Sequence, residues 1–193
     1  MLLWTVQPQS AWTDIRKTGV FRCQREKSFN LTKPDSLEKP YRWLMDRMRE
    51  KIGPAPAGVD YPVWAWHTWE FERRAPDPNS AAFVKRTEAK VLLTLDVPAF
   101  QAVLTDFDAW QLLLQNAYVA DAKTEEEYIR LEAWMEGLAP ETLARETEAS
   151  WDRVFLIDPV DSEWLTRGKY VQATFWEIRR EYVKKAEELP ALE

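Results

Sequence analysis

The sequence contains a single cysteine, Cys23, among its 193 residues. One thiol cannot form an internal disulfide, which is the usual support of small secreted proteins. No apolar run approaches the roughly 18 residues that a membrane-spanning helix needs. The first residues also lack the basic and apolar regions of a secretion signal. Together these absences predict a cytoplasmic protein that does not act at a membrane.

Glycine and histidine are also scarce, with five glycines and one histidine, His67. Phosphate-binding loops and the nucleophile elbow of serine hydrolases depend on closely spaced glycines, and neither motif occurs. A lone histidine excludes any multi-histidine metal site. Asp96, Asp106 and Asp108 could supply oxygen ligands for a divalent cation. Helix capping accounts for Asp106 without a metal, so we expect no metal site.

The net charge of −6 is unevenly distributed along the chain. Residues 1–60 carry 11 lysines and arginines against 7 acidic residues, whereas residues 61–178 carry 11 against 21. Much of the acid lies between Asp121 and Glu148. Because duplex binding depends on neutralising phosphates, an acidic surface makes a double-stranded nucleic acid a poor partner. A small anionic ligand near the N-terminal part is still allowed.

Tryptophan, in contrast, is abundant, with eleven in the chain. Trp64, Trp66 and Trp69 lie within one short segment, and alternation along a strand would place Trp64 and Trp66 on the same side. Aromatic rings of this kind either stack on a planar ligand such as a base or fill a protein core. The sequence leaves both interpretations open.

Hydrophobic periodicity and turn residues predict strands and helices in a mixed order that does not alternate regularly. The predicted strands are Leu2 to Gln7, Val20 to Arg25, residues 63–69, Lys90 to Val97, Val154 to Ile157 and Tyr170 to Ile178. The predicted helices are Ser10 to Lys17, ended by Gly19, Pro40 to Ile52, one capped by Asp106, Thr124 to Glu136 and Pro140 to Ala149. Lys90 to Val97 is nearly all apolar and should be a central strand. Loops are expected at residues 28–39 and 73–80.

This succession favours a single α+β domain over residues 1–193, with a mixed or split β-sheet flanked by helices. An acidic helical insertion at about residues 121–149 interrupts it.

Six segments, spread over nearly the whole chain, match the pattern of a known family. They are Leu3-Trp-Thr-Val-Gln7, Tyr41-Arg-Trp-Leu-Met45, Tyr61-Pro-Val-Trp-Ala-Trp66, Leu93-Thr-Leu-Asp-Val-Pro98, Thr105-Asp-Phe-Asp-Ala-Trp110 and Gln172-Ala-Thr-Phe-Trp-Glu-Ile178. Through these segments the chain resembles the bacterial domain of unknown function numbered 3841. That resemblance implies little chemistry.

The order of elements is also similar, more distantly, to that of the ADP-ribosyltransferase superfamily. A first strand runs into a helix that ends at Gly19, and a glutamate, Glu177, lies on a late strand. Enzymes of that superfamily resemble one another in using a first-strand Arg or His, a middle aromatic or hydroxyl residue and a late-strand Glu to hold and activate NAD. Here the first strand offers only Thr5 and Gln7. The resemblance implies NAD as a candidate cofactor, but the sequence does not identify a cofactor.

Glu177 and His67 are the candidate catalytic residues. Alternation along the closing strand gives Glu177 the same face as Phe175, so its carboxylate would lie among apolar groups, where pKa values are often shifted for catalysis. A structural ion pair with an arginine is the alternative. His67 could carry a proton near neutral pH, or it could be a hydrogen-bonded core residue.

The candidate substrate-binding residues are Thr5, Gln7, Trp64 and Trp66. If the neighbouring strands are parallel, Gln7, His67 and Glu177 would meet in one cleft.

These residues lead to two hypotheses. In the first, the protein binds a nucleotide-like or anionic small ligand, and a divergent ADP-ribosyltransferase-like enzyme is one form of it, although the sequence does not decide whether the protein is an enzyme. In the second, it is a non-catalytic protein-interaction module with a tryptophan-rich structural core, whose acidic helices between Thr124 and Ala149 dock a basic protein.

Overall fold

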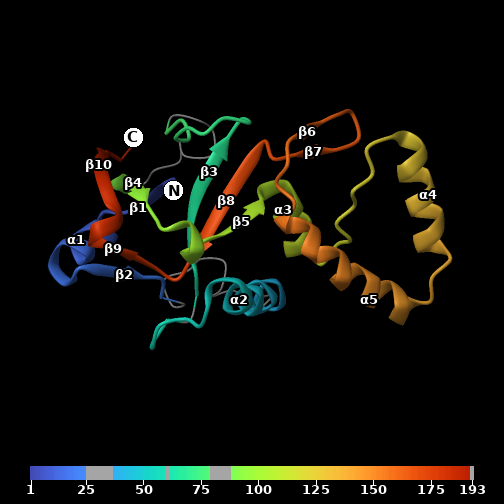
Figure 1. Ribbon diagram of the computed structural model, residues 1–193, viewed down its shortest axis with the longest axis horizontal. Coiled ribbons are helices and arrows are strands. Elements are labelled where there is room, and N and C mark those ends of the chain that lie inside the picture. Colours follow the sequence, from blue (N-terminus) through green and yellow to red (C-terminus); the bar gives the residue numbers. More distant parts are fainter. Residues whose placement is uncertain (25–36, 60, 79–87, 192–193) are drawn as a thin grey trace.

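The computed structural model describes residues 1–24, 37–59, 61–78 and 88–191. Within these ranges the chain forms five α-helices and a six-stranded sheet in one α+β domain (Figure 1). None of the helices found there is both long and apolar enough to cross a bilayer. Most of the loop predicted at residues 28–39, and the end of the loop predicted at 73–80, lie outside the described residues.

The main sheet contains six strands in the order β10-β4-β1-β3-β8-β5. The strands are β1 (Leu2–Pro8), β3 (Val63–Trp69), β4 (Lys90–Asp96), β5 (Val103–Asp106), β8 (Tyr170–Phe175) and β10 (Val183–Leu189). Four of them confirm strands predicted from the sequence. Every pair of neighbours is antiparallel. The strand directions are therefore not mixed.

The strand β4 is an interior strand paired on both sides, in agreement with its continuous apolar sequence, and it lies next to the edge of the sheet. It lies between β1 and β10, and Val91, Leu93 and Leu95 are fully buried. Its neighbour β10 was not predicted, because the charged sequence Val-Lys-Lys-Ala-Glu-Glu-Leu lacks apolar alternation. Such charges are typical of edge strands, where they prevent pairing with another chain.

The sheet is split between β1 and β3. These two strands share one pair of facing Cα positions, Trp4 and Trp66, whereas β1 pairs with β4 along its whole length. Beyond Trp4 the strands separate, and the Thr5 hydroxyl donates a hydrogen bond of 2.8 Å to the Trp64 carbonyl. The Gln7 amide in turn donates to Thr5 Oγ1 at 2.8 Å. The Thr5 side chain thus bridges β1 and β3 where their backbone pairing is missing, and it holds the Gln7 amide.

The helices are α1 (Gln9–Thr18), α2 (Glu38–Ile52), α3 (Phe107–Leu114), α4 (Glu125–Glu136) and α5 (Pro140–Ser150). The predicted caps Asp106 and Thr124 are confirmed, since their side chains accept backbone N–H groups of α3 and α4. Gly19, with φ of 84°, ends α1 as predicted. The predicted Ser10 cap is wrong, because Pro8 stands before the first helical residue and α1 begins at Gln9.

Each face of the sheet packs against a separate hydrophobic core. Ile15 of α1 joins Leu3, Leu93 and Phe175 on one face. On the other, α2 and α3 enclose a core in which five tryptophans take part: Trp43, Trp64, Trp110, Trp151 and Trp176. Much of the tryptophan content is therefore structural.

Two predicted strands are wrong in detail. The segment from Val154 lies in and after a 3-10 helix, η3 (Trp151–Phe155), which continues α5 and buries Trp151 and Val154. A short apolar run cannot by itself distinguish a strand from a buried helical turn.

The closing strand is also interrupted, at Trp176. The indole of Trp176 turns into the α2 core and its Nε1 donates a hydrogen bond of 3.1 Å to the Gly53 carbonyl. After this break β9 (Glu177–Arg179) leaves the main sheet and pairs with β2 (Val20–Arg22), with Arg22 facing Glu177.

Four short elements complete the described fold. They are η2 (Ala99–Gln101), β6 (Val160–Asp161), β7 (Thr166–Arg167) and η4 (Arg180–Tyr182). β6 and β7 pair to form a small hairpin.

Candidate functional site

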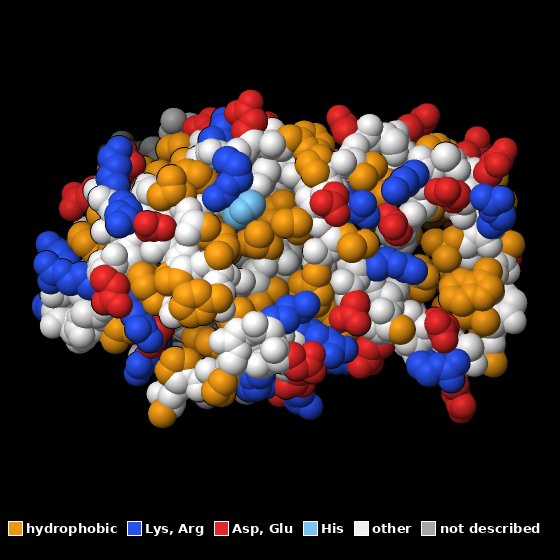
Figure 2. All heavy atoms as spheres, in the orientation of Figure 1, with side chains coloured by type: hydrophobic (Ala, Val, Ile, Leu, Met, Phe, Trp, Pro, Cys, Tyr) orange, Lys and Arg blue, Asp and Glu red, His pale blue; other side chains and the backbone are white. Residues whose placement is uncertain are grey.

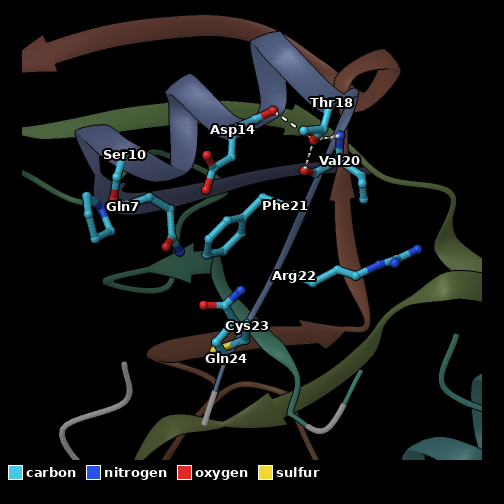
Figure 3. A pocket seen from close by; sticks show the side chains of 10 residues that line it. Gln7, Ser10, Asp14, Thr18, Val20, Phe21, Arg22, Cys23 and Gln24 are labelled. Atoms are coloured by element: carbon cyan, nitrogen blue, oxygen red, sulfur yellow. Dashed lines mark hydrogen bonds between the residues drawn. The ribbon is translucent and has the colours of Figure 1, made fainter. Parts of the chain in front are cut away.

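A pocket of about 390 Å³ lies between α1 and β2, beside the end of β1 (Figure 3). Its volume is in the range of small-molecule sites. We call it the α1/β2 pocket. The described residues that line it are Gln7, Pro8, Ser10, Asp14, Thr18, Val20, Phe21, Arg22, Cys23 and Gln24.

The local sequence places these side chains together. Pro8 ends β1 and leads directly into α1, so Gln7 lies where the chain turns from strand to helix. Ser10, Asp14 and Thr18 recur every four residues and therefore share one face of α1. The adjacent stripe carries Ala11 and Ile15, which are buried. This arrangement anchors α1 to the sheet and leaves its polar face toward the pocket.

Several polar groups at the pocket are available to a ligand. Gln7 and Asp14 point toward the space beside the Phe21 ring (Figure 3). Within the part of the chain that the structure describes, Gln7 Oε1, Ser10 Oγ and the Asp14 carboxylate have no hydrogen-bond partner. The Thr18 hydroxyl, in contrast, is occupied, since its oxygen lies 2.9 Å from the carbonyls of both Asp14 and Val20 and its one proton is donated toward them.

Arg22 contributes its stem to the pocket but directs its guanidinium away (Figure 3). Its Nε lies 2.9 Å from Glu177 Oε2, and Arg179 Nε lies 2.8 Å from Glu177 Oε1. Burial raises the pKa of Glu177, but the hydrogen bonds from Arg22 and Arg179 outweigh burial and hold this pKa below its ordinary value. Glu177 is therefore an ionised carboxylate held between two cations, of which Arg22 links β2 to β9.

Glu177 does not line the α1/β2 pocket. It lines a separate crevice of about 200 Å³, together with Phe100, Trp176 and Tyr182. Its predicted place on the face of Phe175 is wrong, because the break at Trp176 moves Glu177 into a different sheet. Gln7 and Glu177 are therefore not brought into one cavity.

His67 lies far from Gln7 along the sheet. Since β1 and β3 are antiparallel, the end of β3 lies near the start of β1, where Arg73 bonds to the carbonyls of both His67 and Leu2. Figure 2 shows the histidine at the surface beside a basic side chain. Burial, Arg73 and the N-terminal charge lower the pKa of His67 to about 4. The expected meeting of Gln7, His67 and Glu177 required parallel strands, and it does not occur.

Trp64 and Trp66 share a face, as alternation predicts, but they pack against α3. Trp64 contacts Trp110 at a centroid distance of 5.0 Å, and Trp66 contacts Phe107 at 5.4 Å. Neither ring lines the α1/β2 pocket. The buried Trp64 Nε1 has no hydrogen-bond partner among the described residues.

Of the candidate residues, the structure therefore places Gln7 in the pocket and Thr5 directly behind it. Sequence reasoning missed Ser10, Asp14 and Phe21. The four-residue spacing of Ser10 and Asp14, beside the buried stripe of Ala11 and Ile15, was the signal that could have identified these two residues. Cys23 also lines the pocket, where burial raises the pKa of its thiol. This thiol is therefore a weak nucleophile at neutral pH.

Comparison with known proteins gives a family and no activity. Residues 2–184 match the family described as Domain of unknown function (DUF3841). No curated protein matches the chain, and no solved structure does so either. Because the match spans nearly all of its length, the chain belongs to the family Domain of unknown function (DUF3841).

Proposed function

We propose that this protein binds a nucleotide-like ligand through its nucleoside part, in the α1/β2 pocket. The observation that carries the proposal is the group of unpartnered polar atoms on Gln7, Ser10 and Asp14 beside the Phe21 ring. A carboxylate accepts hydrogen bonds from ribose hydroxyls, and carboxamides can pair with the edge of a base. Stacking of a base on an aromatic side chain contributes about 1 to 3 kcal/mol.

The charges of the pocket favour the nucleoside over the phosphate. Asp14 is an acidic side chain at the pocket, and a phosphate placed beside it would be repelled. Arg22 is the cation among the described lining residues, and its guanidinium is directed to Glu177. Phosphate groups of the ligand would therefore extend toward solvent. This narrows the ligand class from any small anion to compounds that contain a nucleoside.

The residues present do not fit the activation of NAD that the ADP-ribosyltransferase resemblance implies. That chemistry places a late-strand glutamate in the ligand cleft. Here Glu177 is held by Arg22 and Arg179 and lines a different crevice. The proposal therefore includes no transfer of ADP-ribose from NAD. NAD remains a useful test ligand because it contains adenosine.

Calorimetric titration with adenosine, NAD, ADP-ribose and inorganic phosphate tests the proposal. Adenosine and the two larger compounds should bind with similar affinity, because they share the part that enters the pocket, and phosphate should not bind. Binding of phosphate with no binding of adenosine would show an anion site instead. The absence of binding by all four compounds at millimolar concentration would also contradict the proposal.

A further inference from the structure

Helix α4 carries no buried residue. It lies at the far end of the molecule from α1 and is followed by α5, which leads back toward the sheet (Figure 1). Half of the large apolar side chains exposed among the described residues lie on α4 or on the hairpin beside it: Tyr128, Ile129, Trp134 and Trp164. Exposed apolar groups that gather in one place are typical of interaction sites.

Four apolar side chains of α4 form one face, and Ile129 lies on the opposite side of the helix. Tyr128, Leu131, Trp134 and Met135 follow helical spacing, and we call them the α4 apolar face. Tyr128 and Trp134 are 37% and 42% exposed, and Leu131 and Met135 are half-buried. Trp164 and Tyr118 each touch one edge of this face, at ring centroid distances of 5.6 Å from Tyr128 and 6.0 Å from Trp134. The face is thus only partly covered.

The surroundings of the α4 apolar face are strongly acidic. Residues 121–150 contain nine acidic side chains against three basic ones. Figure 2 shows apolar side chains at this end of the molecule bordered by acidic and basic ones. A partner that covers the face must therefore bring apolar groups together with positive charge.

The ends of α4 differ in how well they are stabilised. At the N-terminus, Thr124 accepts the Glu127 N–H, and the Glu127 carboxylate accepts the Lys123 N–H at 2.7 Å. The last turn has no basic residue, and the helix ends at Glu136. An acidic group at this end is unfavourable for the helix dipole. Lysine or arginine from a partner would compensate for it.

We infer that the α4 apolar face docks a basic amphipathic helix of a partner protein. The partner's apolar side chains pack between Tyr128 and Trp134, and its lysines or arginines face the acidic side chains along α4, including Glu132 and Glu136. Aromatic residues commonly anchor such interfaces. This inference does not depend on the proposed function, because the α1/β2 pocket lies at the other end of the domain (Figure 1).

The probe is a short synthetic helical peptide with leucines along one face and lysines along the other, measured by fluorescence anisotropy. It should bind the full chain with an affinity that falls as salt increases. Trp134→Ala should weaken binding by about tenfold or more, as loss of an interface anchor does. Ile129→Ala is the matched control, because Ile129 lies on the opposite side of the same helix. Circular dichroism should show both variants folded, since α4 buries no residue.

Three results would overturn the inference. The first is that a peptide of the same composition, with its leucines scattered around the helix, binds as tightly as the amphipathic peptide. The second is that Trp134→Ala and Ile129→Ala bind the amphipathic peptide equally. The third is that sedimentation shows a dimer of the full chain that Trp134→Ala dissociates, because a second copy of the chain would then cover the face.

Discussion

The Nε atom of Arg22 lies 2.9 Å from a carboxylate oxygen of Glu177, across the paired strands β2 and β9. This ion pair turns the guanidinium of Arg22 away from the α1/β2 pocket and engages the carboxylate of Glu177. The ion pair therefore has a structural role, whereas the polar groups of Gln7, Ser10 and Asp14 remain available to a ligand.

Glu177→Gln should destabilise the fold without affecting the pocket. The variant leaves Arg22 and Arg179 without their shared carboxylate, but both arginines are nearly half exposed, so solvent screens much of the loss. We expect a decrease of about 1 to 2 kcal/mol in the free energy of unfolding by urea at pH 7, below the cost of breaking a fully buried pair. Adenosine binding should be unchanged.

The same variant has a defined pH dependence. The folded-state pKa of Glu177 is lowered, so its stabilising effect is present above the unfolded-state pKa of about 4.3 and is lost as the pH falls through the folded-state value. The difference in stability between the wild type and Glu177→Gln should therefore shrink below about pH 4. If Glu177→Gln instead loses adenosine binding while its stability is unchanged, Glu177 is a ligand-binding residue.

His67 should make the protein less stable in mild acid. Its pKa is about 4 in the folded protein, compared with about 6.5 when unfolded, so the unfolded chain binds more protons between these values. Stability should fall by about 1 to 2 kcal/mol between pH 7.5 and 5, allowing for the partial exposure of the ring. Thermal unfolding of His67→Gln should not show this loss of stability between pH 7.5 and 5. An identical pH dependence of stability in the wild type and His67→Gln would contradict the assignment of this effect to His67.

Two tryptophans that pack in the core beside α2 and α3 should respond differently to substitution by phenylalanine. Trp64 Nε1 has no hydrogen-bond partner among the described residues, so Trp64→Phe removes an unsatisfied donor. Trp176 Nε1 donates to the Gly53 carbonyl, and Trp176→Phe loses that bond. Urea denaturation should show Trp176→Phe to be less stable than Trp64→Phe by about 1 kcal/mol. The reverse order would show that Trp64 has a partner.

Thr5 is a positioning residue for Gln7. Its hydroxyl accepts from Gln7 Nε2 and donates to the Trp64 carbonyl in the split of the sheet. Thr5→Val keeps the shape of the side chain and removes both bonds, which should cost about 1 to 2 kcal/mol of stability and weaken adenosine binding. Thr5→Ser retains the hydroxyl and should restore adenosine affinity. If Thr5→Val binds adenosine normally, the orientation of Gln7 does not depend on Thr5.

The sequence predicted the elements that carry strong local signals. The apolar run at Val91 to Leu95 and the caps Asp106 and Thr124 were sufficient to locate β4, α3 and α4. The candidate site was harder, because it depends on how strands pair. Neither the antiparallel direction of β3 nor the break at Trp176 has a local signature, yet these two features separate His67 and Glu177 from Gln7.

The central claim, nucleoside binding in the α1/β2 pocket, is tested most directly by calorimetric titration of adenosine into the wild type and Asp14→Asn. The Asp14 carboxylate should accept ribose hydroxyls, and a hydrogen bond to a charged group contributes about 1.5 to 3 kcal/mol. Asp14→Asn should therefore bind adenosine at least about tenfold more weakly. Asp46→Asn, which alters an exposed aspartate paired with Arg49 on α2, should bind as the wild type does. Equal adenosine affinity in the wild type and Asp14→Asn would contradict the claim.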